Sequence, residues 1–266
     1  MAITDLSLQI PTLLLFDWHG TLVDTQDAMF EAMTEMLPQL EELDLVDRLL
    51  AEDQCRNADD VKLVRYVRIF RRLHPKILAE RRVSRTDIFN AIFGDDVEAK
   101  RVAHEAYNRS YRNYFGRVTP FQQGVGSYLQ ALKALGLKLG IATNRSREFL
   151  DVELQTVDEG EWVAHIDTTI CADDVSQYKP HPEVIYAALQ TLDIPPDRHA
   201  WYIGDSYQDM VTARCAGVTA IFYNGARTPD EELQQLFVDH PACQPDAIIN
   251  SFDELLDLLE QLQQRD

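Results

Sequence analysis

The segment Phe16-Asp17-Trp18-His19-Gly20-Thr21-Leu22-Val23-Asp24 follows an apolar run, residues 13–16, that is typical of a buried strand. A carboxylate at the end of such a strand, followed at once by glycine and threonine, is poorly explained by packing alone. Open α/β sheets bind their ligands in the crevice beyond the carboxyl ends of the strands. The segment therefore predicts the first strand of such a sheet, with Asp17 at its functional edge.

Three further segments carry polar residues at a strand end or just ahead of a helix. They are Leu137-Lys138-Leu139-Gly140-Ile141-Ala142-Thr143-Asn144, Tyr178-Lys179-Pro180-His181-Pro182 and Trp201-Tyr202-Ile203-Gly204-Asp205-Ser206-Tyr207-Gln208-Asp209. The first and third continue an apolar strand into hydroxyl, amide or carboxylate groups. In the second, Lys179 comes shortly before Pro182. Proline is favoured in the first turn of a helix, so we expect a helix to begin there. These patterns predict one site assembled from several strand ends.

The four segments, in this order, resemble the four motifs of the haloacid dehalogenase superfamily, most of whose members are magnesium-dependent phosphatases. Within it, residues 144–146, 179–182 and 213–218 are most similar to phosphoglycolate-phosphatase relatives that carry a helical cap after the first motif. One position departs from the pattern. The phosphatases of the family usually have a second Asp two residues after the first, and this chain has His19.

Periodicity divides the chain into two styles. Helical periodicity without a convincing strand covers the region after Thr25, and strands alternate with helices from Gly124 onward. We therefore expect an α/β fold, a parallel-sheet Rossmann-like core of residues 1–24 and 119–266, with an inserted all-α cap of residues 25–118. The helices expected in the cap span residues 27–37, 40–55, 61–73, 85–93 and 97–115.

Composition narrows the functional classes. At 266 residues the chain can hold one large core or two domains, and its formal net charge of -19 argues against nucleic acid as a partner. It has no apolar run of about 18 residues and no basic-then-apolar leader, so we expect a cytoplasmic protein without a membrane partner. The four scattered cysteines are typical of reduced thiols.

Residues 61–85 are basic within this acidic chain. They contain nine Lys or Arg residues against the single acid Glu80. One interpretation is a solvated helix face that pairs with acidic neighbours. The other is a positive lip that attracts an anionic substrate or an acidic partner surface.

The resemblance implies a mechanism for a small phosphorylated metabolite. Asp17 would attack phosphorus and form an aspartyl-phosphate, which splits a slow hydrolysis into two easier steps. Mg2+ prefers oxygen ligands, and these would come from Asp17, Asp205 and the main-chain carbonyl of His19, with Asp209 binding directly or through a water. Three further residues would bind the transferring phosphoryl group: Thr143 and Asn144 as hydrogen-bond donors, and Lys179 as the neutralising charge.

His19 leaves three alternatives open. Histidine can protonate a leaving oxygen and later activate water, since its unperturbed pKa of about 6.5 lies near operating pH. It is larger than Asp, however, and its protonated form would repel a metal ion. His19 is therefore a working acid-base substitute, a residue tuned to another reaction, or a sign of weakened hydrolysis.

Three other functions compete with phosphatase activity. A phosphonate-cleaving hydrolase has a similar first motif and uses a cap lysine, for which Lys62 or Lys76 is available, although that branch usually has Arg at the position of Lys179. A metal-free dehalogenase is disfavoured because Asp205 and Asp209 would repel Asp17. A weakly active or non-enzymatic relative would bind a phosphorylated ligand or a protein through its cap.

Overall fold

The computed structural model describes residues 8–80 and 83–265. The chain forms two compact units. One runs to Asp24 and resumes at Val118, and the other is Thr25–Arg117. The two short strands β2 (Val23–Asp24) and β3 (Thr119–Pro120) pair antiparallel at the points where the chain leaves and re-enters the first unit. None of the helices in the described ranges is both long and apolar enough to cross a membrane.

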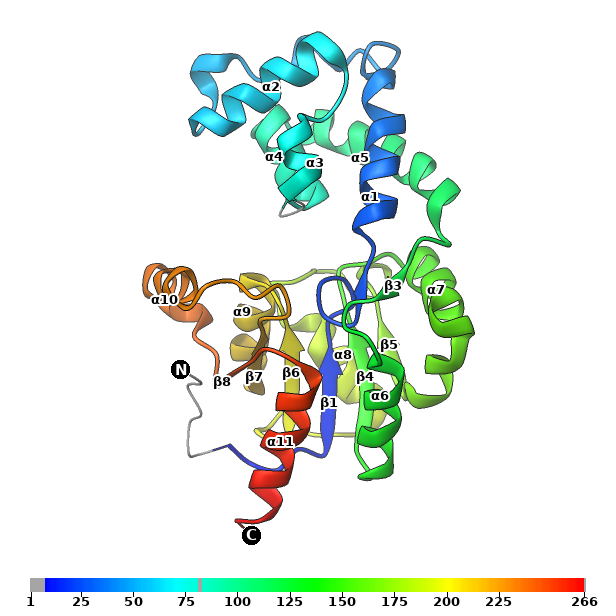
Figure 1. Ribbon diagram of the computed structural model, residues 1–266, viewed down its shortest axis with the longest axis vertical. Helices are drawn as coiled ribbons and strands as arrows, with labels where there is room; N and C mark the ends of the chain where they lie inside the picture. The colour runs from blue at the N-terminus through cyan, green and yellow to red at the C-terminus, as the bar shows by residue number, and fades with distance from the viewer. Residues whose placement is uncertain (1–7, 81–82, 266) are drawn as a thin grey trace. The chain divides into compact units, whose positions relative to one another are not determined.

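The first unit is built on one six-stranded sheet, in the order β5-β4-β1-β6-β7-β8 (Figure 1). Every neighbouring pair in it runs parallel. The α/β class and the parallel sheet expected from the alternating pattern are therefore confirmed. The strands are β1 Leu13–Phe16, β4 Lys138–Ala142, β5 Thr168–Ile170, β6 Ala200–Gly204, β7 Thr219–Tyr223 and β8 Ala247–Ile249.

Helices cover both faces of the sheet, which explains why its central strands are mainly apolar. Leu14 and Phe16 of β1 point into one core, and Leu13 and Leu15 point into the other. The first core is closed by α6 (Val125–Ala134), α7 (Arg147–Thr156) and α11 (Phe252–Gln263). The second is closed by α8 (Glu183–Leu192), α9 (Tyr207–Ala216) and α10 (Asp230–Asp239).

The described residues of the second unit form helices joined by turns and loops, without a strand. α1 packs against α5, and α4 contacts both α2 and α5. Aromatic side chains fill its interior, and the rings of Phe89 and Tyr107 meet edge to face with centroids 6.4 Å apart. The helices are α1 Gln26–Met36, α2 Ala58–Phe70, α3 Pro75–Glu80, α4 Arg85–Phe93 and α5 Val97–Tyr111.

The prediction of a helix over residues 40–55 was wrong. This stretch contains only 3-10 turns, Leu37–Leu40, Val46–Arg48 and Glu52–Gln54. Asp44 adopts a left-handed backbone with φ of 54°, which short polar side chains tolerate. Leu49 is extended, and its carbonyl and that of Leu50 accept hydrogen bonds from Arg68 at 3.0 and 2.9 Å. Tertiary hydrogen bonds thus replace the helical ones that the apolar spacing suggested.

Other boundaries shifted because of caps. α2 begins earlier than expected, since the Asn57 side chain accepts from the backbone N–H groups of Asp59 and Asp60. It ends at Phe70, because the next residue, Arg71, adopts a left-handed backbone. α3 and α10 were not expected at all.

The basic segment finds its partners inside the second unit. Arg65 makes two hydrogen bonds to the carboxylate of Glu52, and Lys62 Nζ lies 2.9 Å from Asp59 Oδ1. The Arg85 guanidinium lies over the Tyr107 ring, 4.9 Å from its centroid. Arg81 and Arg82 lie outside the described residues. These contacts favour the interpretation of a solvated face with internal ion pairs.

Candidate active site

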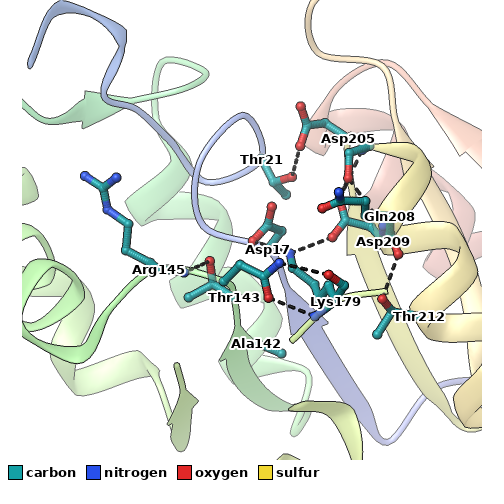
Figure 2. A network of polar contacts seen from close by, with 12 residues as sticks. Asp17, Thr21, Ala142, Thr143, Arg145, Lys179, Asp205, Gln208, Asp209 and Thr212 are labelled. Atoms are coloured by element: carbon teal, nitrogen blue, oxygen red, sulfur yellow. Dashed lines mark hydrogen bonds and ion pairs between the residues drawn. The ribbon is translucent and has the colours of Figure 1, made fainter. Parts of the chain in front are cut away.

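The parallel register brings the polar strand ends together. Phe16 at the end of β1 is level with Ile141 of β4 and with Ile203 of β6. The next residues of each strand therefore emerge at one edge of the sheet, as expected for a parallel arrangement. Figure 2 shows Asp17, Thr143, Lys179, Asp205 and Asp209 converging there from segments far apart in the sequence.

Lys179 is the positive centre of this cluster. Its side chain is 4% exposed, and its Nζ lies 2.8 Å from Asp17 Oδ1 and 2.7 Å from Asp209 Oδ1. A third oxygen, the hydroxyl of Tyr202, accepts a hydrogen bond from Nζ at 3.0 Å. The ammonium group donates hydrogen bonds to Tyr202 and Asp209 and forms an ion pair with Asp17. The buried lysine therefore couples Asp17 to Asp209.

Asp209 is held on both of its carboxylate oxygens. Oδ1 accepts from Lys179 Nζ and, at 3.0 Å, from the Tyr202 hydroxyl. Oδ2 accepts from the backbone N–H and the hydroxyl of Ser206 at 3.0 and 2.5 Å. A Cβ on Gly204 would lie 2.4 Å from Asp209 Cγ, so a glycine is needed for this close approach. Both carboxylate oxygens of Asp209 therefore accept hydrogen bonds from protein groups, and these bonds hold Asp209 beside Lys179.

Asp205 approaches Asp17 from the end of β6. It is half-buried, and its Oδ1 lies 3.4 Å from the Thr21 hydroxyl, which donates to it. Gly20 has φ of 81°, and a Cβ there would come within 2.3 Å of Asp205 Oδ2. Glycine is therefore needed at position 20 for two reasons: its left-handed backbone and the close approach of Asp205.

The cluster carries more negative than positive charge. With three ionised carboxylates and one ammonium its formal charge is -2. Burial raises the pKa of Asp17, and the Lys179 charge only partly opposes that rise. Burial also raises the pKa of Asp205 well above its usual range, and the charges of Asp209 and Asp17 add to the effect. A bound cation would relieve this repulsion.

The donor set fits a hard divalent cation. Asp17, Asp205 and Asp209 each offer an oxygen, and these atoms lie within 4.8 Å of one another. Asp17 Oδ1 is buried and ion-paired with Lys179 Nζ, but it accepts no hydrogen bond from the described residues. A buried acceptor without a donor is costly, and a metal ion would satisfy it.

The second-motif residues have protein partners in this arrangement. Asn144 pairs with the backbone of Lys179: its Nδ2 donates to the Lys179 carbonyl at 3.1 Å, and its Oδ1 accepts from the Lys179 N–H at 2.9 Å. The buried Thr143 accepts a hydrogen bond on its hydroxyl from the Arg145 N–H at 3.2 Å. Asn144 thus aligns the segment that carries Lys179, and its contact with phosphate stays a prediction.

His19 lies on the turn that follows Asp17. The residue is half-buried and forms an isolated bridge with Val23, and the Gly20 N–H donates to the Val23 carbonyl at 2.9 Å. The backbone of this turn thus positions His19, which follows Asp17 by two residues in the sequence. Its acid-base role and the metal contact of its carbonyl stay predictions.

Two buried features of this edge were not expected from the sequence. The Tyr202 hydroxyl lies 2.7 Å from the Ala142 carbonyl as well as beside Lys179 and Asp209. Glu153 is fully buried and contacts Trp18 and Arg145. The available signals were a phenol inside a buried strand and an acid on the apolar stripe of a helix, since both need a buried partner.

Comparison with known proteins identifies the family of this chain. The sequence profile of the haloacid dehalogenase-like hydrolases matches residues 14–223. The phosphoglycolate phosphatases of Escherichia coli (strain K12) and Salmonella typhimurium (strain LT2) are each 27% identical over 247 residues, which covers 92% of this chain and 90% of the relative.

Solved structures show the same fold. A candidate phosphoglycolate phosphatase from Lactobacillus plantarum is 19% identical with a TM-score of 0.66, covering 94% of this chain and 100% of its own. CbbY from Rhodobacter sphaeroides, solved in complex with phosphate, is 21% identical with a TM-score of 0.59, covering 92% of this chain and 96% of its own. The profile match spans most of the chain, and the chain therefore belongs to the haloacid dehalogenase-like hydrolase family.

Proposed function

We propose that the protein is a magnesium-dependent phosphatase that hydrolyses a small phosphate monoester through an aspartyl-phosphate on Asp17. The observation that carries this proposal is the buried cluster at the edge of the sheet. A strand-end carboxylate stands beside an ammonium group and two further carboxylates, all within ion-pair or ligand distance. Phosphoryl transfer needs this combination of a placed nucleophile and positive charge.

In the first step a carboxylate oxygen of Asp17 attacks phosphorus. The bond between phosphorus and the leaving oxygen breaks, and the leaving oxygen takes a proton from the imidazolium of His19. In the second step water attacks the phosphorus of the aspartyl-phosphate and gives its proton to the neutral imidazole. The bond from phosphorus to Asp17 then breaks, so that inorganic phosphate leaves and the carboxylate is restored.

Asp17, Asp205 and the main-chain carbonyl of His19 would hold the magnesium ion. Asp209 would act through a bridging water, because both of its oxygens already accept hydrogen bonds from Lys179, Tyr202 and Ser206. When bound, the ion supplies positive charge that offsets the charge of the phosphoryl oxygens. The charge of Lys179, in direct contact with Asp17, favours the ionised carboxylate and opposes the rise in its pKa that burial causes.

Two residues of the second motif would bind the phosphoryl oxygens. The Thr143 hydroxyl accepts from Arg145, which orients its own O–H for donation. The Asn144 amide gives one hydrogen to the Lys179 carbonyl and keeps a second for substrate. Phosphoglycolate is the first substrate to test, because the relatives at 27% identity are phosphoglycolate phosphatases.

The competing functions find less support. The Lys62 side chain is 66% exposed and paired with Asp59, and Lys76 is also exposed, whereas a Schiff-base lysine is activated by desolvation or by a neighbouring cation. A metal-free reaction would leave three carboxylates facing a single lysine. The remaining alternative, a non-enzymatic relative that binds a phosphorylated ligand or a protein, is distinguished by the release of phosphate.

Release of inorganic phosphate tests the proposal directly. Phosphoglycolate and a panel of other small phosphate monoesters would be assayed with magnesium, with a chelator, and with magnesium restored after chelation. We expect turnover only when magnesium is present, and we expect Asp17→Asn to lower kcat by about 10⁴-fold or more. Unchanged activity in repurified Asp17→Asn would overturn the mechanism.

A separate set of variants tests His19. His19→Ala should slow hydrolysis by about 10²–10⁴-fold and remove one limb of the pH-rate profile. His19→Asp restores the residue common in the family, and we expect it to keep or raise activity. If His19→Ala matches the wild type in rate and pH profile, the proton carrier lies elsewhere and the phosphonate-cleaving reaction becomes the better candidate.

A further inference from the structure

Glu153 is a fully buried acid that the proposed reaction does not use. It lies on α7, on the same face as the buried Phe149, Leu150 and Leu154. Acids are rarely buried completely unless they are paired, because removing a carboxylate from water is costly. Its presence in this apolar stripe calls for partners that offset the cost.

The partners come from two separate loops of the site. Glu153 Oε2 accepts a hydrogen bond from the indole N–H of Trp18 at 2.8 Å and another from Arg145 Nε at 3.0 Å. Arg145 Nη2 contacts the other oxygen, Oε1. Trp18 directly follows Asp17, and Arg145 directly follows the second-motif pair. A single carboxylate therefore ties the nucleophile loop to the phosphate-binding loop.

Trp18 makes several of the contacts that hold the turn carrying His19. Its backbone carbonyl accepts from the N–H groups of Leu22 and Val23, each at 3.0 Å. Its indole packs edge-on against Trp162, with ring centroids 6.1 Å apart and an interplanar angle of 78°. The turn is thus anchored at one residue, and the bond to Glu153 fixes the rotation of that anchor.

Arg145 directs its charge away from the reacting groups. Figure 2 shows its side chain leading away from Asp17 and Lys179. Its guanidinium lies over the Phe149 ring, 5.2 Å from the centroid, and binds Glu153. Its backbone N–H meanwhile donates to the Thr143 hydroxyl. Holding the Arg145 side chain on Glu153 therefore orients the residue that is expected to bind phosphate.

We propose that Glu153 is a positioning residue, which sets the register of residues 18–23 against residues 143–145 so that nucleophile and phosphate-binding groups face one phosphorus atom. This inference rests on the proposed function. Small misplacements of reacting groups reduce turnover by up to about 10²-fold. The loss should appear in kcat more than in KM, because binding of the phosphate charge does not depend on the alignment of attack.

The test compares Glu153→Gln with Asp246→Asn. Asp246 is also buried, lies 2.7 Å from Arg198 and accepts from a backbone N–H, but it precedes β8, away from the clustered residues. Both variants replace a buried, arginine-paired carboxylate by its amide. We expect Glu153→Gln to lower kcat by about 10- to 100-fold, and Asp246→Asn to leave kcat unchanged at a similar loss of unfolding midpoint. Equal kcat in the two variants would reduce Glu153 to a structural role.

Trp18→Phe supplies the second arm, and it serves alone if Glu153→Gln does not fold. It removes the indole N–H and keeps an aromatic ring, so we expect a loss of kcat of about 10-fold or more. The double variant should be no slower than the slower single variant, because the two residues act as one unit. Multiplying losses would show independent roles and overturn the inference.

A binding measurement separates this inference from the proposed function. Beryllofluoride with magnesium mimics a phosphoryl group on a carboxylate, and its affinity can be measured without turnover. If the wild type hydrolyses nothing in the panel, the proposed substrate class fails, while weaker beryllofluoride binding by Glu153→Gln than by Asp246→Asn still supports positioning. Equal affinities of the two variants, or no binding by the wild type, would end the inference as well.

Discussion

Ion pairs of similar length occur in both units of this protein, but their surroundings differ. In the first unit Lys179 meets Asp209 at 2.7 Å, with side chains 4% and 0% exposed. In the second unit Arg65 meets Glu52 at 2.5 Å, with side chains 59% and 49% exposed. The interatomic distance therefore says little about what such a pair does, and the surrounding dielectric decides it.

In the buried cluster, burial and neighbouring charges both shift pKa values, whereas in the exposed pair hydrogen bonding is the main cause of the shift. Burial alone would lower the pKa of Lys179, yet the charges of Asp17 and Asp209 raise it above its ordinary value. The hydrogen bond from Arg65 lowers the pKa of Glu52. Water and salt screen the exposed charges, so we expect mutations to have larger effects in the buried cluster than at the exposed pairs of the second unit.

Lys179→Met should give the largest effect. It leaves Asp17, Asp205 and Asp209 without their buried cation, so turnover should vanish. In a chelator the free energy of unfolding should fall by about 3 kcal/mol, as when one partner of a buried pair is removed. Chemical denaturation with and without magnesium would measure it.

Lys133→Met is the control for this loss. Lys133 is paired with Asp167 at 2.7 Å, and the side chains are 27% and 17% exposed. We expect about 1 kcal/mol or less, as for surface pairs. Equal losses at the two lysines would show that burial does not distinguish these pairs.

Gly20→Ala should give the next effect, and Gly136→Ala is its matched control. Both glycines have positive φ, 81° and 82°, so alanine is strained at either position. At Gly20 the new Cβ would also collide with Asp205, whereas nothing lies within 4 Å at Gly136. We expect a stability loss in both variants but loss of magnesium-dependent turnover only in Gly20→Ala. Normal turnover there would mean that Asp205 can move without consequence.

His104 should make the stability of the second unit depend on pH. Burial against α4 lowers the pKa of His104 to about 4, and the charges of Arg85 and Lys100 contribute. Its folded pKa lies below its ordinary value of 6.5, so the unfolded chain takes up a proton first. Stability should therefore decline as pH falls from 6.5 toward 4. His104→Gln should flatten this part of a plot of unfolding midpoint against pH; an unaltered slope would assign the decline to other groups.

Arg65→Ala should give the smallest effect. Its partner Glu52 is exposed, and such pairs exchange readily with water and salt. We expect no measurable change in the unfolding midpoint at physiological salt and a small decrease at low ionic strength. A large loss that persists at high salt would show that the basic face is part of the packing.

The local sequence pattern correctly predicted those elements whose conformation depends on residues close by in the sequence. Apolar runs marked β1, β4 and β6, and the polar residues that end them followed from the parallel sheet. Local pattern failed over residues 40–55, where Arg68 bonds to the carbonyls of Leu49 and Leu50 from 19 and 18 residues away. A helical spacing of apolar residues cannot report such a competing partner.

The sequence by itself determined the family motifs, their order, and the edge at which Asp17, Thr143 and Asp205 gather, because each of them follows a parallel strand. Only the tertiary structure decided how the buried charges are shared. It assigned the oxygens of Asp209 to neighbouring protein groups, and it joined Glu153 to Trp18 across 135 residues. The reason is physical: a buried charge takes whichever partners the packed core brings to it, and that choice leaves no periodic trace along the chain.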